Sequence, residues 1–429
     1  MELKKYKLGE ILDVTRGASL SGEFYATEGK YIRLTCGNFD YQNNCFKENK
    51  SKDNIYYVGD FKPEFLMEKG DIITPLTEQA IGLLGSTAII PESSKYIQSQ
   101  DVAKIICKED LLDKDFAFYL ISSALVKQQL SAAAQQTKIR HTSPDKIKDC
   151  TVWIPELSEQ KRIGKLLCSI DRKIELNRAI NQNLEAMAKQ LYDYWFVQFD
   201  FPNGEGKPYK SSGGKMVWNE KLKREIPQGW NNGMLIDIAN ITMGQSPDGS
   251  SYNEVGEGML FYQGSTDFGM RFPSVRQYTT APSRYAKRGD ILMSVRAPVG
   301  SINIANNDCC IGRGLSAINS KLGSTTHLYY ILNDLRIAFE QRNAAGTTFG
   351  SITKEDLYSL PIIIPSHEVI RAFDKICSPM FDRQMILGEE IDNLIKQRDG
   401  LLPLLMNGQV SVNSDLSKCI SKIGIVALI

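Results

Sequence analysis

The sequence predicts an α+β protein in which one unit of about 210 residues occurs twice. Two observations support this prediction. Five blocks of sequence recur in the same order along the chain, and in each copy a region with strand and turn signals is followed by a long amphipathic helix. The expected fold is therefore two globular α/β domains joined by two long antiparallel coiled-coil helices, related by a pseudo-two-fold internal repeat.

The five recurring blocks keep their order and similar gaps between them. The clearest match joins a Gly-Asp-Ile motif in the first copy to the same motif in the second, and each motif is followed by an apolar stretch that contains glycine. The matched blocks are 7–17 with 233–244, 68–73 with 287–292, 81–90 with 299–305, 116–121 with 327–332, and 146–155 with 356–365.

The first part of each copy predicts a globular domain, at residues 1–155 and 226–365. Short runs of β-branched and aromatic residues, such as 31–34 and 70–74, alternate with Gly, Pro, Asn and Asp. These runs are typical of strands separated by turns. A helical patch at 115–130 lies among them, so the domain is expected to mix helices and strands.

The second part of each copy predicts a long helix, at 156–200 and 366–410. From Ser158 onward, apolar residues recur at the spacings of three and four that mark an amphipathic helix. Ser158 is the expected N-cap, and Glu159 favours the positive end of the helix dipole. We expect the two helices to pack on each other as a coiled coil. Asn177 falls within the first apolar stripe, where a polar residue either sets the register or marks a solvated position.

Two further segments complete the domain plan. Residues 201–225 are rich in Gly, Ser, Pro and Lys, and they predict a linker between the copies. Residues 411–429 form a tail to which the sequence assigns no role, and disorder or a frayed end is expected there.

The composition indicates a reducing compartment. The first residues lack the apolar run of a signal peptide, and no stretch approaches the ~18 apolar residues of a membrane span. The nine cysteines include no Cys-x-x-Cys pair, so neither a zinc site nor a disulfide framework is expected. Cys309 and Cys310 should pack in a strand as small apolar side chains. We therefore expect a cytoplasmic protein with reduced thiols.

No motif indicates a catalytic or metal site. The three histidines are far apart, and there is neither a Gly-x-x-x-x-Gly-Lys loop nor a Gly-x-Ser-x-Gly elbow. The Gly-x-Gly at 312–314 lacks the third glycine of a dinucleotide site. Pro144-Asp145 together with residues 159–161 resembles the carboxylate arrangement of many nucleases, but the second copy cannot form it. No catalytic residue, metal or bound cofactor is expected.

The net charge of +1 argues against a nucleic-acid binder unless basic residues gather locally. They gather at 47–62 and 138–141 in the first copy and at 271–313 in the second. Such patches hold phosphates and read base edges, although they also occur as plain solvated surface. The loops 135–142 and 345–352 occupy matching places with different side chains, as in two readers of different sequences or in two neutrally drifting loops.

The start of the first long helix resembles a known family. Residues 155–163 (Pro-Glu-Leu-Ser-Glu-Gln-Lys-Arg-Ile) are similar to the Pro-x-x-x-Glu-Gln-x-x-Ile hallmark of type I restriction–modification specificity subunits. Residues 201–214, followed by Ile-Pro-Gln-Gly-Trp at 226–230, resemble the central region of the same family. The second copy departs from the hallmark at 366–370, where the likeness depends on position and periodicity.

This resemblance implies a non-catalytic, sequence-specific DNA-binding subunit. The globular domains would be target recognition domains, each reading one half of a bipartite site in double-stranded DNA. The helices would set the spacing of the halves and bind methyltransferase (M) subunits, expected to number two, and through them restriction (R) subunits. S-adenosylmethionine, ATP and magnesium would be bound by those partners, and no membrane would be involved.

Base-reading residues cannot be carried over from the family, since recognition domains differ with their targets. Chemistry selects Arg, Lys, Asn and Gln, supported by Ser or Thr, as readers of base edges. Gln79 and Arg296 are favoured because they follow the matching Gly-Asp-Ile strands. The DNA-binding candidates are Arg33, Asn38, Gln79, Lys138 and Arg140 in the first domain, and Gln263, Arg271, Arg276, Arg296, Arg313 and Thr348 in the second.

Two other functions remain as alternatives. A DNA-cleaving or DNA-methylating enzyme would need catalytic carboxylates or an Asn-Pro-Pro-Tyr-type motif, which the sequence lacks. A coiled-coil scaffold without DNA function would leave the basic patches without a use.

Overall fold

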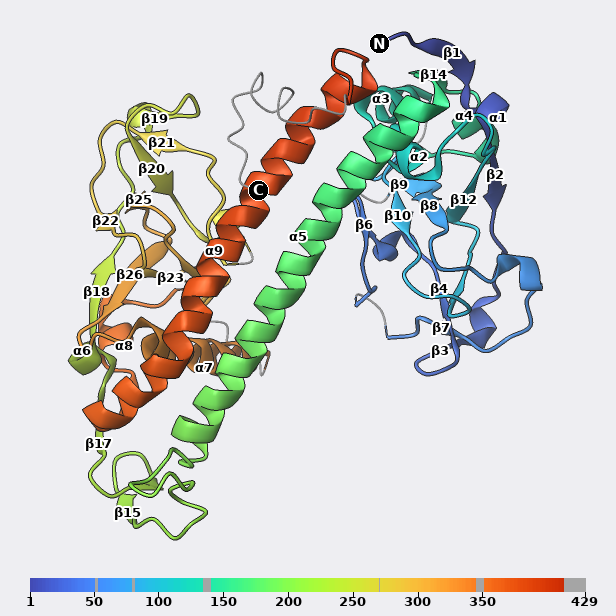
Figure 1. The fold of residues 1–429 in the computed structure, drawn as a ribbon. Coiled ribbons are helices and arrows are strands. Elements are labelled where there is room, and N and C mark those ends of the chain that lie inside the picture. Colours follow the sequence, from blue (N-terminus) through green and yellow to red (C-terminus); the bar gives the residue numbers. More distant parts are fainter. Residues whose placement is uncertain (51–52, 79–81, 134–139, 270, 345–350, 413–429) are drawn as a thin grey trace. The chain divides into compact units, whose positions relative to one another are not determined.

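The computed structural model describes residues 1–50, 53–78, 82–133, 140–269, 271–344 and 351–412 (Figure 1). The chain forms two compact units: unit 1 is Met1–Ile174 with Asn393–Ile429, and unit 2 is Glu175–Asp392. Each unit contains one globular domain and a part of both long helices. Among the described residues, no helix combines the length and the apolar run that crossing a membrane requires.

Unit 1 contains the first globular domain, called domain 1. Strand β12 lies between β2 and β8, with β10 beyond β8, and a second sheet has the order β11-β4-β7-β3. The elements are β1 (Lys4–Lys7), α1 (Leu8–Ile11), β2 (Leu12–Arg16), β3 (Tyr25–Ala26), β4 (Tyr31–Arg33), β5 (Phe39–Asp40), β6 (Cys45–Phe46), β7 (Tyr56–Tyr57), β8 (Ile72–Pro75), β9 (Thr77–Glu78), β10 (Ala88–Ile89), β11 (Tyr96–Ile97), β12 (Val102–Cys107), α2 (Lys114–Ile121), α3 (Ala124–Ala133), β13 (Arg140–His141), α4 (Pro144–Lys148) and β14 (Thr151–Ile154).

Unit 2 contains the second globular domain, called domain 2, which repeats this plan. Strand β26 lies between β18 and β23, with β24 beyond β23, and a second sheet has the order β19-β21-β20-β25-β22. The elements are β15 (Met216–Asn219), β16 (Arg224–Pro227), β17 (Asn231–Met234), α6 (Leu235–Ile238), β18 (Ala239–Met243), β19 (Tyr252–Asn253), β20 (Met259–Tyr262), β21 (Tyr278–Thr279), β22 (Tyr285–Ala286), β23 (Ile291–Ser294), β24 (Ile302–Ile304), β25 (Cys309–Ile311), β26 (Leu315–Ser320), α7 (Thr325–Ala344), α8 (Lys354–Tyr358) and β27 (Pro361–Ile364).

The strand pairings confirm the internal repeat. In domain 1, β4 pairs in parallel with β11, and in domain 2 β20 pairs in parallel with β25. In domain 1, β1 pairs with the last strand, β14, and in domain 2, β17 pairs in the same way with the last strand, β27. The predicted strand packing of Cys309 and Cys310 is also confirmed, since both side chains are fully buried in β25.

The two predicted long helices are α5 (Leu157–Tyr192), which is followed by a π-helical turn at Asp193–Val197, and α9 (His367–Met406). The prediction of Ser158 as the N-cap is wrong. The Glu156 carbonyl accepts the Glu159 and Gln160 amides, so the helix starts earlier, and the Ser158 hydroxyl donates to the Glu156 carboxylate.

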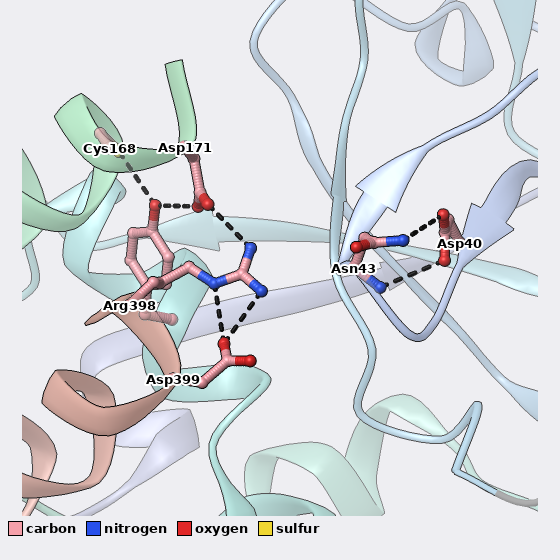
Figure 2. Close-up of polar contacts among 7 residues, drawn as sticks. Asp40, Asn43, Cys168, Asp171, Arg398 and Asp399 are labelled. Carbon is pink, nitrogen blue, oxygen red and sulfur yellow. Dashed lines mark hydrogen bonds and ion pairs between the residues drawn. The ribbon is translucent and has the colours of Figure 1, made fainter. Parts of the chain in front are cut away.

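Within unit 1, α5 and α9 pack antiparallel beside domain 1. Ile163 near the start of α5 and Leu405 near the end of α9 belong to one buried cluster with Phe116 of α2. Further along α5, Arg398 of α9 donates to Asp171 at 2.8 Å, and Figure 2 shows its guanidinium between Asp171 and Asp399. The Arg398 side chain is only 11% exposed, so this ion pair is part of the interior.

Within unit 2, the same two helices again pack antiparallel. Phe196, just after α5, lies 5.0 Å from Phe373 near the start of α9, measured between ring centroids. Further into α9, the side-chain amide of Gln384 donates to the backbone carbonyl of Asn181 at 3.2 Å. Asn177 is 1% exposed, which excludes the solvated position and leaves a register role as a prediction.

The segment that was predicted to be a linker, 201–225, has its own ordered contacts in unit 2. The Phe201 ring stacks between Tyr209 and Trp230, at centroid distances of 4.7 and 5.0 Å. Asp200 accepts both the amide and the hydroxyl of Ser211, at 2.7 and 2.6 Å. These contacts, together with the β15–β16 hairpin, hold the segment against the end of α5.

Candidate nucleic-acid interface

Four chain segments of domain 2 meet where their strands end, and we call them the domain 2 loop cluster. The Gln245 amide donates to Ile311 at 3.0 Å, Gly314 donates to Gln263 at 3.2 Å, and Val295 donates to Gly314 at 2.9 Å. The cluster therefore has a hydrogen-bonded backbone although it lies outside the sheets. Its segments are 244–246 after β18, 263–264 after β20, 295–296 after β23, and 312–314 between β25 and β26.

Glycines permit this close approach of the backbones. A Cβ on Gly314 would lie 2.6 Å from the Gln263 carbonyl oxygen, and one on Gly244 would lie 2.2 Å from the Gly312 carbonyl oxygen. Both distances are too short for any side chain. The Gly-x-Gly at 312–314, which does not qualify as a dinucleotide site, thus allows close packing of the backbone. The residue between the two glycines, Arg313, is exposed.

Three of the predicted DNA-binding residues meet in this cluster with exposed side chains: Gln263, Arg296 and Arg313. Within the described ranges, none of these three side chains makes a hydrogen bond or ion pair. Their backbones are engaged instead: the Arg313 amide donates to the Ser246 hydroxyl at 3.3 Å, and the Gln263 amide donates to Asp267 at 3.2 Å. These side chains are therefore free to contact a ligand.

Arg276 is oriented differently, toward a carboxylate of its own domain. Its Nε donates to Asp267 at 2.7 Å, and the other oxygen of Asp267 accepts the Gln263 amide at 3.2 Å. The Asp267 side chain is 7% exposed and that of Arg276 is 60% exposed. Arg276 therefore neutralises the buried charge of Asp267, and Asp267 in turn holds the backbone of Gln263 in place.

Arg271 is buried at the junction of domain 2 with both long helices. It pairs with Glu185 of α5 at 3.0 Å, and its guanidinium lies 4.3 Å from the ring centroid of Phe381 on α9. Only 8% of the residue is exposed. Arg271 therefore stabilises the packing of domain 2 on the helices, and it does not belong to the loop cluster.

Arg33 and Asn38 of domain 1 also have internal partners. The Arg33 guanidinium stacks on Tyr25 at 3.8 Å from the ring centroid and donates to the Asn54 carbonyl at 3.2 Å. Asn38 is 1% exposed, and its side chain accepts the Thr35 amide and donates to Lys47. Residue type alone selected them, because sequence carries no signal of such burial.

The remaining candidates cannot be placed in this way. Gln79, Lys138 and Thr348 lie outside the described residues. Arg140 is described by its backbone, in β13 opposite Glu78 of β9.

Domain 1 has a corresponding cluster in the same strand framework, which we call the domain 1 loop cluster. Its segments are 17–18 after β2, 76–77 after β8, 98–101 between β11 and β12, and His141 of β13. The Leu76 amide donates to Asp101 at 2.8 Å, as Val295 donates to Gly314 in domain 2, so Thr77 takes the place of Arg296. The Thr77 hydroxyl lies 3.3 Å from the Asp101 carboxylate and 3.2 Å from His141 Nδ1.

Two exposed residues of this cluster, Gln100 and His141, are missing from the DNA-binding candidates, although His141 lies in the basic patch at 138–141. Equal backbone positions in the two domains thus carry different polar side chains. The basic patch at 138–141 was the sequence signal for His141, whereas Gln100 is identified only by its place in the strand framework.

The nuclease-like carboxylates do not form a site. The Glu159 side chain is 6% exposed and accepts hydrogen bonds from Arg162 at 2.8 Å and from the Val412 amide at 2.8 Å. The Asp145 side chain is 94% exposed and faces Lys148 at 3.9 Å. In the described part of the chain, no three His, Cys, Asp or Glu side chains are grouped so as to hold a metal ion.

Comparison with known proteins gives one consistent result. The family model for the type I restriction modification DNA specificity domain matches residues 1–186 and again 227–397. A putative type I restriction enzyme MjaX specificity subunit from Methanocaldococcus jannaschii is 30% identical over 373 residues, which are 83% of each chain. The HindI specificity subunit of Haemophilus influenzae is 23% identical over 465 residues, covering 95% of this chain and 99% of that one.

A solved structure supports the fold. The chain is similar to the S subunit of a type I restriction–modification system from M. genitalium, with a TM-score of 0.62 and 16% sequence identity. The match covers 95% of this chain and 96% of that chain.

Proposed function

The chain belongs to the family of type I restriction–modification DNA specificity subunits, and from this we propose that its two domains each read one half of a divided DNA target. It recognises DNA sequence and is non-catalytic, as are the specificity subunits it resembles. The observation that supports two half-sites is the pair of loop clusters, since both stand on the same strand framework and carry different polar side chains.

The long helices have a second use in this proposal, as docking surfaces for methyltransferase subunits. Leu176 of α5 and Ile386 of α9 are 52% and 55% exposed, so each offers apolar surface to a partner. Each follows, at the same interval, the proline that ends its domain, Pro155 or Pro365. The two side chains thus occupy equivalent positions in the repeat, as expected if each contacts one of two identical methyltransferase subunits.

A groove on unit 2 adds apolar surface for the same partner. It measures about 860 Å³ and lies between the end of α5 and the first half of α9. Met187, Leu191 and Tyr194 line it from α5 and the turn after it, and Ile376 and Met380 line it from α9. Exposed Met and aromatic side chains are typical of interface cores.

The remaining parts of the reaction belong to other chains in this proposal. S-adenosylmethionine would be bound by the methyltransferase subunits, and ATP and magnesium by restriction subunits docked through them. This chain would supply the sequence selection and the spacing between half-sites. Because its target is DNA, we expect the protein to act in the cytoplasm.

The test is to map methylated sites produced by the complex assembled with its methyltransferase subunits. We expect one divided motif, with two specified halves and an unspecified spacer. Exchanging residues 1–155 for another recognition domain of the family should change one half only. Loss of both halves, or a motif without a spacer, would contradict two independent readers.

A further inference from the structure

We propose that domain 2 reads a guanine in its half-site through Arg313, held at the tip of the 312–314 loop. This inference deepens the proposed function and depends on it. It concerns which base pair the domain 2 loop cluster selects and which side chain makes the selection. Four properties of the loop carry it.

The loop backbone is held from both sides. Gly312 donates to the Tyr262 carbonyl at 2.8 Å and Gly314 donates to the Gln263 carbonyl at 3.2 Å. Between them, the Arg313 amide donates to Ser246 at 3.3 Å. A reader of base edges needs a backbone that is already placed before DNA binds, and three hydrogen bonds over three residues meet that need.

The tip is also narrow. Arg313 is flanked by two glycines, so no neighbouring side chain widens the loop or competes for the approach to DNA. The Cβ positions of Gly312 and Gly314 would lie 2.9 Å from the Gln263 Cα and 2.6 Å from the Gln263 carbonyl oxygen. The two glycines therefore seat the loop against residue 263, and the exposed Arg313 is the side chain that the 312–314 segment presents.

The guanidinium has no competing carboxylate in the cluster. The segments 244–246, 263–264, 295–296 and 312–314 contain no Asp or Glu. The nearby Asp267 is buried and neutralised by Arg276. Among the described residues, Arg313 makes no side-chain hydrogen bond, unlike Arg271 and Arg276.

Donor chemistry then selects the base. Arginine offers only donors, and guanine presents two acceptors, N7 and O6, side by side in the major groove. Adenine pairs one acceptor with one donor, and cytosine presents a donor, so neither matches a two-pronged donor. Gln263, which carries both a donor and an acceptor, lies beside Arg313 and suits an adjacent adenine.

The test uses the complex assembled with its methyltransferase subunits, on duplexes carrying its mapped motif. Domain exchange first identifies the half read by domain 2. Each guanine of that half is then replaced by 7-deazaguanine, which lacks the N7 acceptor. We expect the wild-type complex to lose roughly 10-fold in affinity at one position, and the Arg313→Ala complex to be insensitive to that replacement.

Two variants serve as comparisons. Arg313→Lys keeps the charge but not the two-pronged geometry, so it should bind DNA and discriminate less. Arg371→Ala removes an exposed arginine of α9, outside the cluster, and should keep the whole motif. Circular dichroism of each variant verifies that it folds.

The outcomes are distinct. A half-site of domain 2 without guanine overturns this inference and leaves the divided reading intact. Weaker binding by Arg313→Ala with undiminished sensitivity to every 7-deazaguanine would mean a phosphate contact, and would also overturn it. A wild-type complex that shows no divided motif would instead contradict the proposed function.

Discussion

The hydroxyl of Tyr119 donates to the carboxylate of Asp171 at 2.5 Å, which ties α2 of domain 1 to α5. The same carboxylate accepts Arg398 of α9 at 2.8 Å, so one side chain connects three helices of unit 1. Burial, and then the neighbouring Asp171 charge, raise the pKa of Tyr119 above its ordinary value. The tyrosine therefore keeps its proton and acts as the donor.

Asp171→Asn should destabilise the protein by about 3 kcal/mol, because it leaves the buried Arg398 without its main counter-charge. Chemical denaturation followed by tyrosine fluorescence would measure the change. Asp149→Asn is the matched control, since Asp149 is 80% exposed and pairs with Lys7 at the surface. Equal effects of the two substitutions would show that the network contributes no more than a surface pair.

Arg271→Ala should lower the free energy of unfolding by about 2 kcal/mol, since it removes packing on Phe381 and the partner of Glu185. Arg296→Ala, at an exposed residue with no side-chain partner in the described part of the chain, should change it by less than about 0.5 kcal/mol. The comparison uses denaturation midpoints of the two variants. The reverse order would contradict the assignment of Arg271 to the interior.

Arg296→Ala should nevertheless weaken DNA binding. An exposed cation beside the 312–314 loop is placed to meet a phosphate, so the loss should be similar for all sequences. The slope of log affinity against log salt should become shallower by about one unit. Fluorescence anisotropy at several salt concentrations measures this slope. A change in the preferred motif would show instead that Arg296 reads a base.

His327 should make unit 2 less stable in acid. Burial lowers the pKa of His327 to about 3, against an ordinary value of 6.5. Between pH 6.5 and about 3 the unfolded chain binds a proton that the folded chain excludes. The free energy of unfolding therefore decreases as the pH is lowered, by up to about 1.4 kcal/mol per pH unit. His327→Phe, which introduces the side chain that Phe116 has at the matching position of the first copy, should remove this part of the acid dependence. Denaturation at pH 7 and pH 5 distinguishes the two slopes.

Leu176→Asp and Ile386→Asp should each weaken the attachment of one methyltransferase subunit, because a charge would be buried in an apolar contact. Native mass spectrometry of the assembled complex would show species lacking one subunit. Val255→Asp is the control, since Val255 is 80% exposed and lies between β19 and β20 of domain 2 rather than on α5 or α9. Unchanged assembly by both helix variants would exclude these two points as docking sites.

Much of the architecture could be predicted because its signals are local. The Gly-Asp-Ile motifs, the apolar spacing of three and four in the long helices, and the glycine-rich turns each depend on neighbouring residues. Helix bounds were less predictable. Ser158 has the chemistry of an N-cap, but the Glu156 carbonyl already accepts the first helical hydrogen bonds.

The sequence by itself determined the duplicated plan, the two long helices, the lack of catalytic motifs and the family. Only the tertiary structure decided which polar side chains are available to DNA. Arg271 and Glu185 are 86 residues apart, and Arg276 meets a buried Asp267 whose other oxygen holds Gln263. Such pairings depend on how distant segments pack. An arginine that is chemically suited to a base can therefore be engaged within the fold, while the side chain of Arg313, between two glycines, has no partner among the residues that the structure describes.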